Sequence, residues 1–71
     1  MDKERLRDLR KEKGETQREA SYAIGITETM LSKYELGTES NPTVSTLQAI
    51  AGHYGVTVGY LLGETDEKSP A

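Results

Sequence analysis

Glycines placed at intervals divide this chain into five segments of helix length. Each follows a stretch with helical patterning, where glycine suits the position just beyond a helix C-terminus because it readily adopts the left-handed conformation. A Thr or Asp that can cap a helix N-terminus stands before each stretch. The glycines are Gly14, Gly25, Gly37, Gly55 and Gly63, and the caps are Asp2, Thr16, Thr27, Thr43 and Thr57. The spacing predicts helices at about 3–13, 17–24, 28–36, 44–54 and 58–62, and no segment alternates long enough to indicate a strand.

The apolar residues within these segments recur at helical spacing, so the helices can bury them in one shared core. The expected core positions are Leu6, Leu9, Ala20, Ile24, Ile26, Leu31, Tyr34, Leu47, Ile50, Ala51, Tyr54, Val56, Val58, Leu61 and Leu62. With 71 residues the chain suffices for one small all-α domain, which we place at 1–63. Residues 64–71 lack an apolar anchor, and we expect an acidic flexible tail or the start of a linker.

Composition excludes several classes of function. The chain has no cysteine, which rules out disulfides and cysteine-based metal sites and nucleophiles. The single histidine, His53, has no catalytic or metal-binding partner near it in the sequence, so we interpret it as a surface residue or as a residue of the C-terminal turn of its helix. No apolar run approaches the roughly 18–20 residues of a membrane span, and the charged start is unlike a signal peptide. We therefore expect a cytoplasmic protein that is not an enzyme and uses no metal or cofactor.

The net charge of −3 argues against a nucleic-acid partner only until the distribution of charge is considered. Residues 1–18 carry seven basic and five acidic side chains, whereas acidic side chains outnumber basic ones in 19–37 and again in 38–71. Overall charge says little about any one face of a protein. The concentration of basic side chains near the N-terminus is therefore compatible with binding to nucleic acid.

Residues 17–36 have the layout of a helix-turn-helix. Two short helices are joined by a three-residue turn, in which Gly25 suits a positive φ and the apolar residue after it can plug the angle between the helices. Ser21 is small enough for a close helix crossing. Thr16 and Glu19 match a capping box, which marks the start of the first helix of the motif.

Over about residues 3–63 the chain resembles the phage lambda repressor/Cro-like (XRE-type) helix-turn-helix family. The resemblance is carried by Leu-Arg-Lys-Glu-Lys-Gly at 9–14, Thr-Gln-Arg-Glu at 16–19, Gly-Ile-Thr at 25–27, Leu-Ser-Lys-Tyr-Glu-Leu-Gly at 31–37, Asn-Pro-Thr at 41–43 and Tyr-Gly-Val-Thr-Val-Gly-Tyr-Leu-Leu at 54–62. It implies a five-helix lambda-repressor-like DNA-binding domain, with the helix-turn-helix at its second and third helices. It also implies a protein that acts at the bacterial nucleoid or is encoded by a phage. Ala20 and Ser21 depart from the family, whose members usually carry Leu then Ala, and predict a thinner core there.

The second helix of the motif, at 28–36, is the expected reading element. Leu31 and Tyr34 define its inner side, so the polar side chains fall on the outer side by helical spacing. A solvated helix face would have the same composition, but the resemblance favours contact with bases in the major groove. We predict base contacts from Thr27, Glu28, Thr29, Ser32 and Lys33.

These residue types suit base edges in different ways. Lys33 can donate to O6 and N7 of guanine, and the hydroxyls of Thr29 and Ser32 can donate or accept. Glu28 can accept a hydrogen bond from N4 of cytosine, or it is a first-turn acid that the helix dipole favours.

Several side chains are candidates for contacts with the DNA backbone. In the resembling family, the residue that matches Gln17 contacts the backbone, and we carry that role over. Lys11 and Lys13 either contact phosphate or interact with the dipole at the C-terminus of their helix. The further backbone candidates are Arg18, Arg10, Ser40 and Asn41.

Arg10 and Glu35 each lie near the core side of their helices, because each comes four residues after a core leucine. Opposite charges in such positions are expected to pair, since a lone, partly buried charge is costly. The resembling family has an Arg–Glu pair at the matching positions. We interpret the pair as mainly structural, with Arg10 also reaching a phosphate.

The resemblance implies a sequence-specific transcriptional regulator, a repressor, that binds double-stranded DNA at a (pseudo)palindromic operator as a homodimer. Val58 and Tyr60 in the last helix are the expected dimer interface, although Val58 suits the core equally well. The alternative is a protein-binding module of the same fold, an antitoxin or partner-docking domain with weak DNA binding. The negative net charge and the carboxylate of Glu28 on the reading side favour that alternative.

Overall fold

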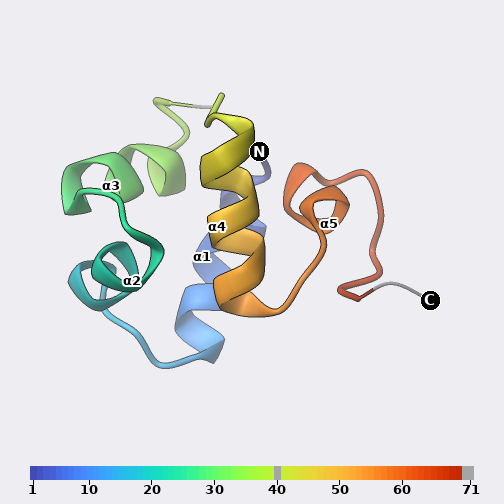
Figure 1. The fold of residues 1–71 in the computed structure, drawn as a ribbon, viewed down its shortest axis with the longest axis horizontal. Helices are drawn as coiled ribbons and strands as arrows, with labels where there is room; N and C mark the ends of the chain where they lie inside the picture. Colours follow the sequence, from blue (N-terminus) through green and yellow to red (C-terminus); the bar gives the residue numbers. More distant parts are fainter. Residues whose placement is uncertain (40, 70–71) are drawn as a thin grey trace.

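The helix-turn-helix lies at one side of a five-helix fold, with α4 crossing the centre and α5 on the opposite side (Figure 1). The computed structural model describes residues 1–39 and 41–69. Helix α2 packs against α3 and α4, α1 packs against α3, and α4 packs against α5. The helices are α1 (Lys3–Glu12), α2 (Gln17–Ile24), α3 (Glu28–Leu36), α4 (Val44–Tyr54) and α5 (Val58–Leu62). The predicted ranges are confirmed, except that α1 ends one residue early, at Glu12, with Lys13 as its C-cap.

Each predicted cap accepts a backbone hydrogen bond at the start of its helix. The carboxylate of Asp2 accepts two such bonds, and each capping threonine accepts one from the third residue of the helix that follows it. Thr16 and Glu19 complete the capping box, and the backbone hydrogen bond from Thr16 lowers the pKa of Glu19. Gly25 has a φ of +91° and turns the chain from α2 into α3. Local chemistry thus sets the helix boundaries.

One hydrophobic cluster connects all five helices. Its fully buried members are Leu6, Leu31, Ile50 and Leu61. The buried hydroxyl of Ser21 is satisfied, since its Oγ donates to the carbonyl of Arg18 at 2.9 Å. The other buried apolar residues are Leu9, Ala20, Ile24, Tyr34, Leu47 and Ala51, and partly buried Ile26, Tyr54, Val56 and Val58 pack against the cluster. The prediction that Leu62 closes the core is wrong: it is 40 % exposed, because Leu61 takes the inward position of the short α5.

Residues 64–69 pack against the domain, whereas the sequence predicts that they form a flexible tail. The backbone N–H of Thr57 donates to the carbonyl of Lys68 at 2.8 Å. The guanidinium of Arg5 donates to the carbonyl of Thr65 and to the carboxylate of Asp66. Backbone hydrogen bonds and ion pairs hold this segment in place of apolar anchors. The last two residues of the predicted tail, 70 and 71, lie outside the described part of the chain.

A two-point ion pair joins α1 to α3. The Nε and Nη2 atoms of Arg10 donate to the two carboxylate oxygens of Glu35 at 2.7 and 3.0 Å. Nη1 of Arg10 donates to the carbonyl of Glu15 at 2.8 Å, which ties the same side chain to the turn before α2. The Glu35 side chain is only 4 % exposed, and the hydrogen bond with it raises the pKa of Arg10. Because both partners are held in one geometry, the pair fixes α3 relative to α1.

Replacing Glu35 with Ala is expected to destabilise the domain far more than replacing Glu28 with Ala. Removing Glu35 leaves the largely buried guanidinium of Arg10 without its counter-ion, at a cost of about 3 kcal/mol. Glu28 is exposed, so its replacement should change stability by less than about 0.5 kcal/mol. Thermal or urea unfolding of the two variants measures the difference. Equal melting temperatures would show that the pair does not hold the helices together.

Candidate nucleic-acid interface

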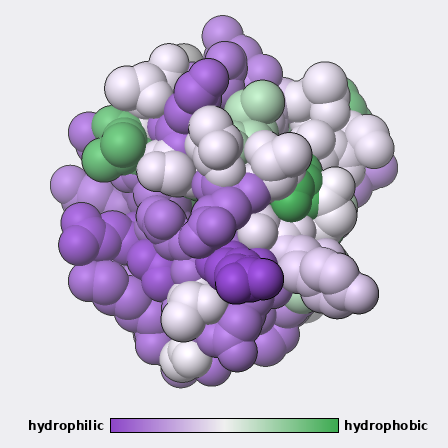
Figure 2. Space-filling view, turned by 90° about the vertical axis from the view of Figure 1, so that its left-hand side faces the viewer, coloured by the Kyte–Doolittle hydropathy of each residue, from purple (hydrophilic) through white to green (hydrophobic). Residues whose placement is uncertain are grey.

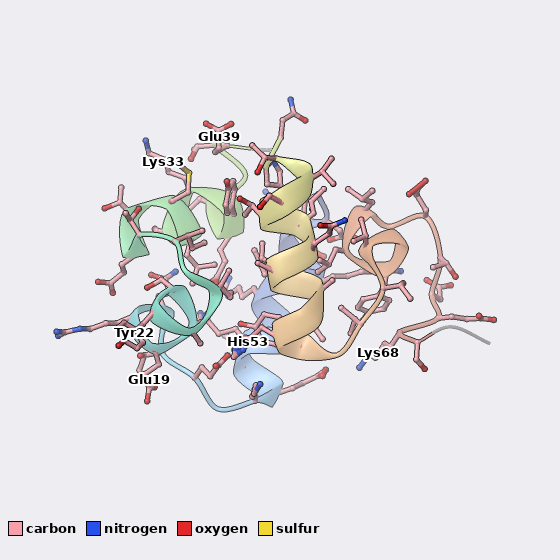
Figure 3. The ribbon with its side chains drawn as sticks, in the orientation of Figure 1. Glu19, Tyr22, Lys33, Glu39, His53 and Lys68 are labelled. Carbon is pink, nitrogen blue, oxygen red and sulfur yellow. The ribbon has the colours of Figure 1, made fainter. Side chains whose placement is uncertain are left out.

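The outer side of α3 is polar and accessible, while its inner side is anchored in the core. Leu31 is fully buried and Tyr34 is 6 % exposed, so both fix the rotation of α3 about its axis. Figure 3 shows the side chain of Lys33 extending away from the body of the domain. Of the five predicted base-contacting residues, Thr27, Glu28, Thr29 and Lys33 are exposed and Ser32 is half-buried. Four of the five are therefore accessible, and Ser32 is accessible in part.

The N-terminal end of α3 is held close to α2 by the turn of the motif. The backbone N–H groups of Gly25 and Ile26 both donate to the carbonyl of Ser21, at 2.9 and 3.0 Å. The side chain of Thr27 accepts from the N–H of Met30 at 3.0 Å, so its hydroxyl oxygen is already engaged as the cap of α3. The first turn of α3 is thereby presented as a rigid end.

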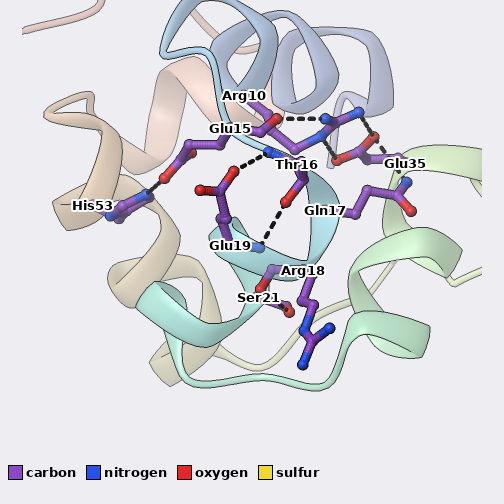
Figure 4. Close-up of polar contacts among 9 residues, drawn as sticks. All are labelled: Arg10, Glu15, Thr16, Gln17, Arg18, Glu19, Ser21, Glu35 and His53. Carbon is purple, nitrogen blue, oxygen red and sulfur yellow. Dashed lines mark hydrogen bonds and ion pairs between the residues drawn. The ribbon is translucent and has the colours of Figure 1, made fainter.

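Gln17 joins the same cluster as the Arg10–Glu35 pair. Its Nε2 atom donates to Oε1 of Glu35 at 3.3 Å, so one carboxylate contacts side chains from α1 and α2 as well as its own helix α3 (Figure 4). Sequence patterns do not predict this contact, because 18 residues separate Gln17 from Glu35 and no local motif connects them. Gln17 is half-buried and begins α2, beside the surface that α3 presents.

The other candidates for backbone contacts differ in how much freedom the structure leaves them. Arg18 and Asn41 are exposed, and Figure 4 shows Arg18 extending away from the Arg10–Glu35 cluster. Arg10 uses all three of its guanidinium nitrogens as donors within the protein, which leaves two of its five N–H groups. Ser40 lies outside the described residues. The surface that carries α2 and α3 is mostly hydrophilic, with small separate apolar spots (Figure 2).

Lys13 and His53 form part of a structural contact between the end of α1 and α4. The Nζ atom of Lys13 donates to the carbonyl of His53 at 3.0 Å, whereas Lys11 has no hydrogen bond or ion pair to a described residue; both side chains are exposed. His53 is half-buried, with Nε2 2.6 Å from the carboxylate of Glu15, and its ring meets that of Tyr54 edge-on. Burial raises the pKa of Tyr54 well above the ordinary range. His53 thus lies in the last turn of α4, the second of the two expected positions, and the turn after α1 brings Glu15 to it.

The predicted dimer-interface residues are half-buried within the domain. Val58 and Tyr60 both pack against the hydrophobic core, and the guanidinium of Arg5 lies 4.4 Å from the centre of the Tyr60 ring. Leu62, 40 % exposed, is the most accessible large apolar residue of α5. No group of three or more His, Cys, Asp or Glu side chains suited to a metal occurs in the described ranges 1–39 and 41–69. No helix in those ranges is long and apolar enough to cross a membrane.

Comparisons with known proteins agree with this geometry. A family model described as helix-turn-helix matches residues 6–61. The HTH-type transcriptional regulator DdrOP3 of Deinococcus deserti is 44 % identical over 59 residues, which are 83 % of this chain and 45 % of DdrOP3. The HTH-type transcriptional regulator SinR of Bacillus licheniformis is 33 % identical over 64 residues, 90 % of this chain and 58 % of SinR. The chain thus spans about half the length of these two relatives.

A solved structure gives the same result for the fold. SinR, described as the master regulator for biofilm formation and crystallised in complex with DNA, superimposes with a TM-score of 0.82 at 31 % identity. The superposition covers 87 % of this chain and 98 % of the SinR chain. From the five helices, the family match and these relatives together, we conclude that the chain belongs to the lambda repressor-like (XRE-type) helix-turn-helix family of DNA-binding transcriptional regulators.

Proposed function

We propose that this domain reads a specific double-stranded DNA sequence by placing α3 in the major groove, as the DNA-binding part of a transcriptional repressor. The observation that carries the proposal is the two-sided character of α3, with Leu31 and Tyr34 buried and a polar outer side accessible. A major groove about 12 Å wide admits one helix. At 1.5 Å per residue the nine residues of α3 extend about 13 Å, which corresponds to about four base pairs.

The base contacts come from the N-terminal and middle parts of α3. Thr27, Glu28, Thr29 and Lys33 are exposed and Ser32 is half-buried, and Lys33 projects away from the body of the domain in Figure 3. Lys33 would donate to guanine, and Glu28 would accept from cytosine. One well-placed contact of this kind discriminates between bases by about 1–3 kcal/mol.

The backbone contacts position the domain on the duplex and carry no sequence information of their own. Gln17 and Arg18 at the start of α2 flank the reading surface, and Arg10 has two N–H groups left for a phosphate. Asn41 is exposed in the connection before α4. Ser40, beside it in the sequence, completes the proposed set. SinR, the relative crystallised with DNA, supports this assignment by its similarity in fold.

The proposed operator is (pseudo)palindromic and is bound by a homodimer, because helix-turn-helix dimers place their two reading helices in half-sites related by the same twofold symmetry. Val58 and Tyr60 are half-buried against the core. We propose that the accessible parts of their side chains form the contact between the two copies. The exposed side chain of Leu62 adjoins them in α5. We propose that the protein acts at the bacterial or phage chromosome. It would repress transcription where such an operator overlaps a promoter.

Selection of bound duplexes from a random DNA pool tests the reading role of α3. The wild-type domain should enrich one half-site, and Lys33→Ala should lose preference at one base position per half-site. Lys68→Ala is the matched control, because Lys68 pairs with Glu12 and lies far from α3 (Figure 3). A wild-type domain that enriches no sequence at low salt but binds a protein tightly would refute the proposal in favour of a partner-docking module.

The dimer is tested by the spacing of half-sites in the selected operator. Half-sites should lie about one helical turn apart, and native mass spectrometry should find two chains on one duplex. Inserting about five base pairs between the half-sites turns one of them to the opposite side of the duplex and should abolish joint binding. Unchanged affinity after the insertion would mean that each domain binds alone.

A further inference from the structure

The unengaged cations of this domain are not spread evenly over it. In the described ranges, four basic side chains are committed within the fold. These are Arg5, Arg10, Lys13 and Lys68, which bind Asp66, Glu35, the carbonyl of His53 and Glu12 respectively. The other basic side chains have neither a hydrogen bond nor an ion pair to another described residue. They are Lys3, Arg7, Lys11, Arg18 and Lys33.

Apart from Arg5, which lies beyond the acidic side chains and binds Asp66, the charged side chains of α1 fall on two flanks. With 100° per residue, its side chains Lys3, Arg7, Arg10 and Lys11 fall within an arc of about 100°. Its acidic side chains Glu4, Asp8 and Glu12 fall within the next arc of about 80°. The helix therefore has one basic flank, which is concealed in the overall charge of −3.

The basic flank of α1 adjoins the C-terminal end of α3. Arg10 pairs with Glu35, and Arg7 and Leu36 line the same hollow. The Lys3 side chain lies against Gly37, where an added Cβ would come within 2.9 Å of its Cδ. Lys3, Arg7 and Arg10 of the basic flank thus lie along the C-terminal end of the proposed reading helix.

A hollow of about 200 Å³ opens at this junction of α1, α2 and α3. It is lined by Arg7, Arg10, Gln17, Glu35 and Leu36. The charges of Arg10 and Glu35 offset each other, and Arg10 directs its three nitrogens to protein acceptors. Arg7 supplies the uncompensated positive charge, and its exposed guanidinium has its full set of donors available.

We propose that Arg7 binds a DNA phosphodiester at this hollow, as a backbone contact from α1 that lies outside the helix-turn-helix itself. The planar guanidinium can donate two parallel hydrogen bonds to phosphate oxygens, a geometry that a lysine cannot match. Leu36, which is 67 % exposed, offers an apolar wall to the adjoining deoxyribose. The inference rests on the proposed function and adds a residue to it.

The test uses the duplex selected by the wild-type domain and compares the wild type with Arg7→Ala. Release of counterions predicts that losing one phosphate contact makes the slope of log K against log salt less negative, by about 0.9. The same relation predicts about fivefold weaker binding at 0.15 M salt. The order of preference for bases should not change. Arg7→Lys should recover the slope but only part of the affinity.

Two controls separate the loss of a phosphate contact from unfolding and from a general loss of positive charge. Arg7→Ala should melt at the wild-type temperature, because the side chain has no partner in the described part of the fold. Lys68→Ala removes the same charge at a distance from α3 and should change the salt slope less.

Inorganic phosphate at the concentration of the DNA phosphates should not compete, because the proposed ligand is a phosphodiester held in place by the bound duplex.

The contacted phosphate is located by replacing the phosphates of the duplex one at a time with uncharged methylphosphonates. One replacement should weaken wild-type binding and leave Arg7→Ala binding unchanged, since the variant has already lost that contact. The inference is overturned if Arg7→Ala binds with wild-type affinity and slope, or if wild type and variant respond alike to every replacement. Absence of duplex binding by the wild type would instead refute the proposed function.

Discussion

The orientation of the proposed reading helix depends on one buried carboxylate. Glu35 of α3 receives two hydrogen bonds from Arg10 of α1 and one from Gln17 of α2, so three helices meet at its two oxygens. A charge this deeply buried is tolerated only where partners satisfy it, which makes other relative positions of these helices costly. A helix that reads bases needs such a fixed position, because small displacements misalign hydrogen bonds with base edges.

The charge distribution reconciles an acidic domain with a polyanionic partner. At physiological salt, charges are screened over about 8 Å, so the local arrangement near a contact matters more than the sum. The acidic C-terminal segment is drawn onto the side of Arg5 and Tyr60, away from α2 and α3 (Figure 1). Basic side chains on α1, α2 and α3 keep their donors accessible around the proposed interface.

Much of the fold was predictable because interactions between residues close in the sequence set the boundaries of its helices. A threonine cap bonds to the third residue of the helix that follows, and a glycine ends a helix by its own backbone conformation, as Gly25 does at +91°. The inner and outer sides of α3 follow from the helical period alone, once Leu31 and Tyr34 are assigned to the core. These interactions join residues a few positions apart, so the amino-acid order specifies them directly.

Contacts between distant segments became visible only in the folded chain. Gln17 meets Glu35, His53 meets Glu15, and the segment 64–69 returns to Arg5 because of how the helices cross. Periodicity tells which side of a helix is buried, but it does not tell which neighbour covers that side or what remains open between them. The hollow beside Arg7 is of this kind, since three helices must be in place before its walls exist.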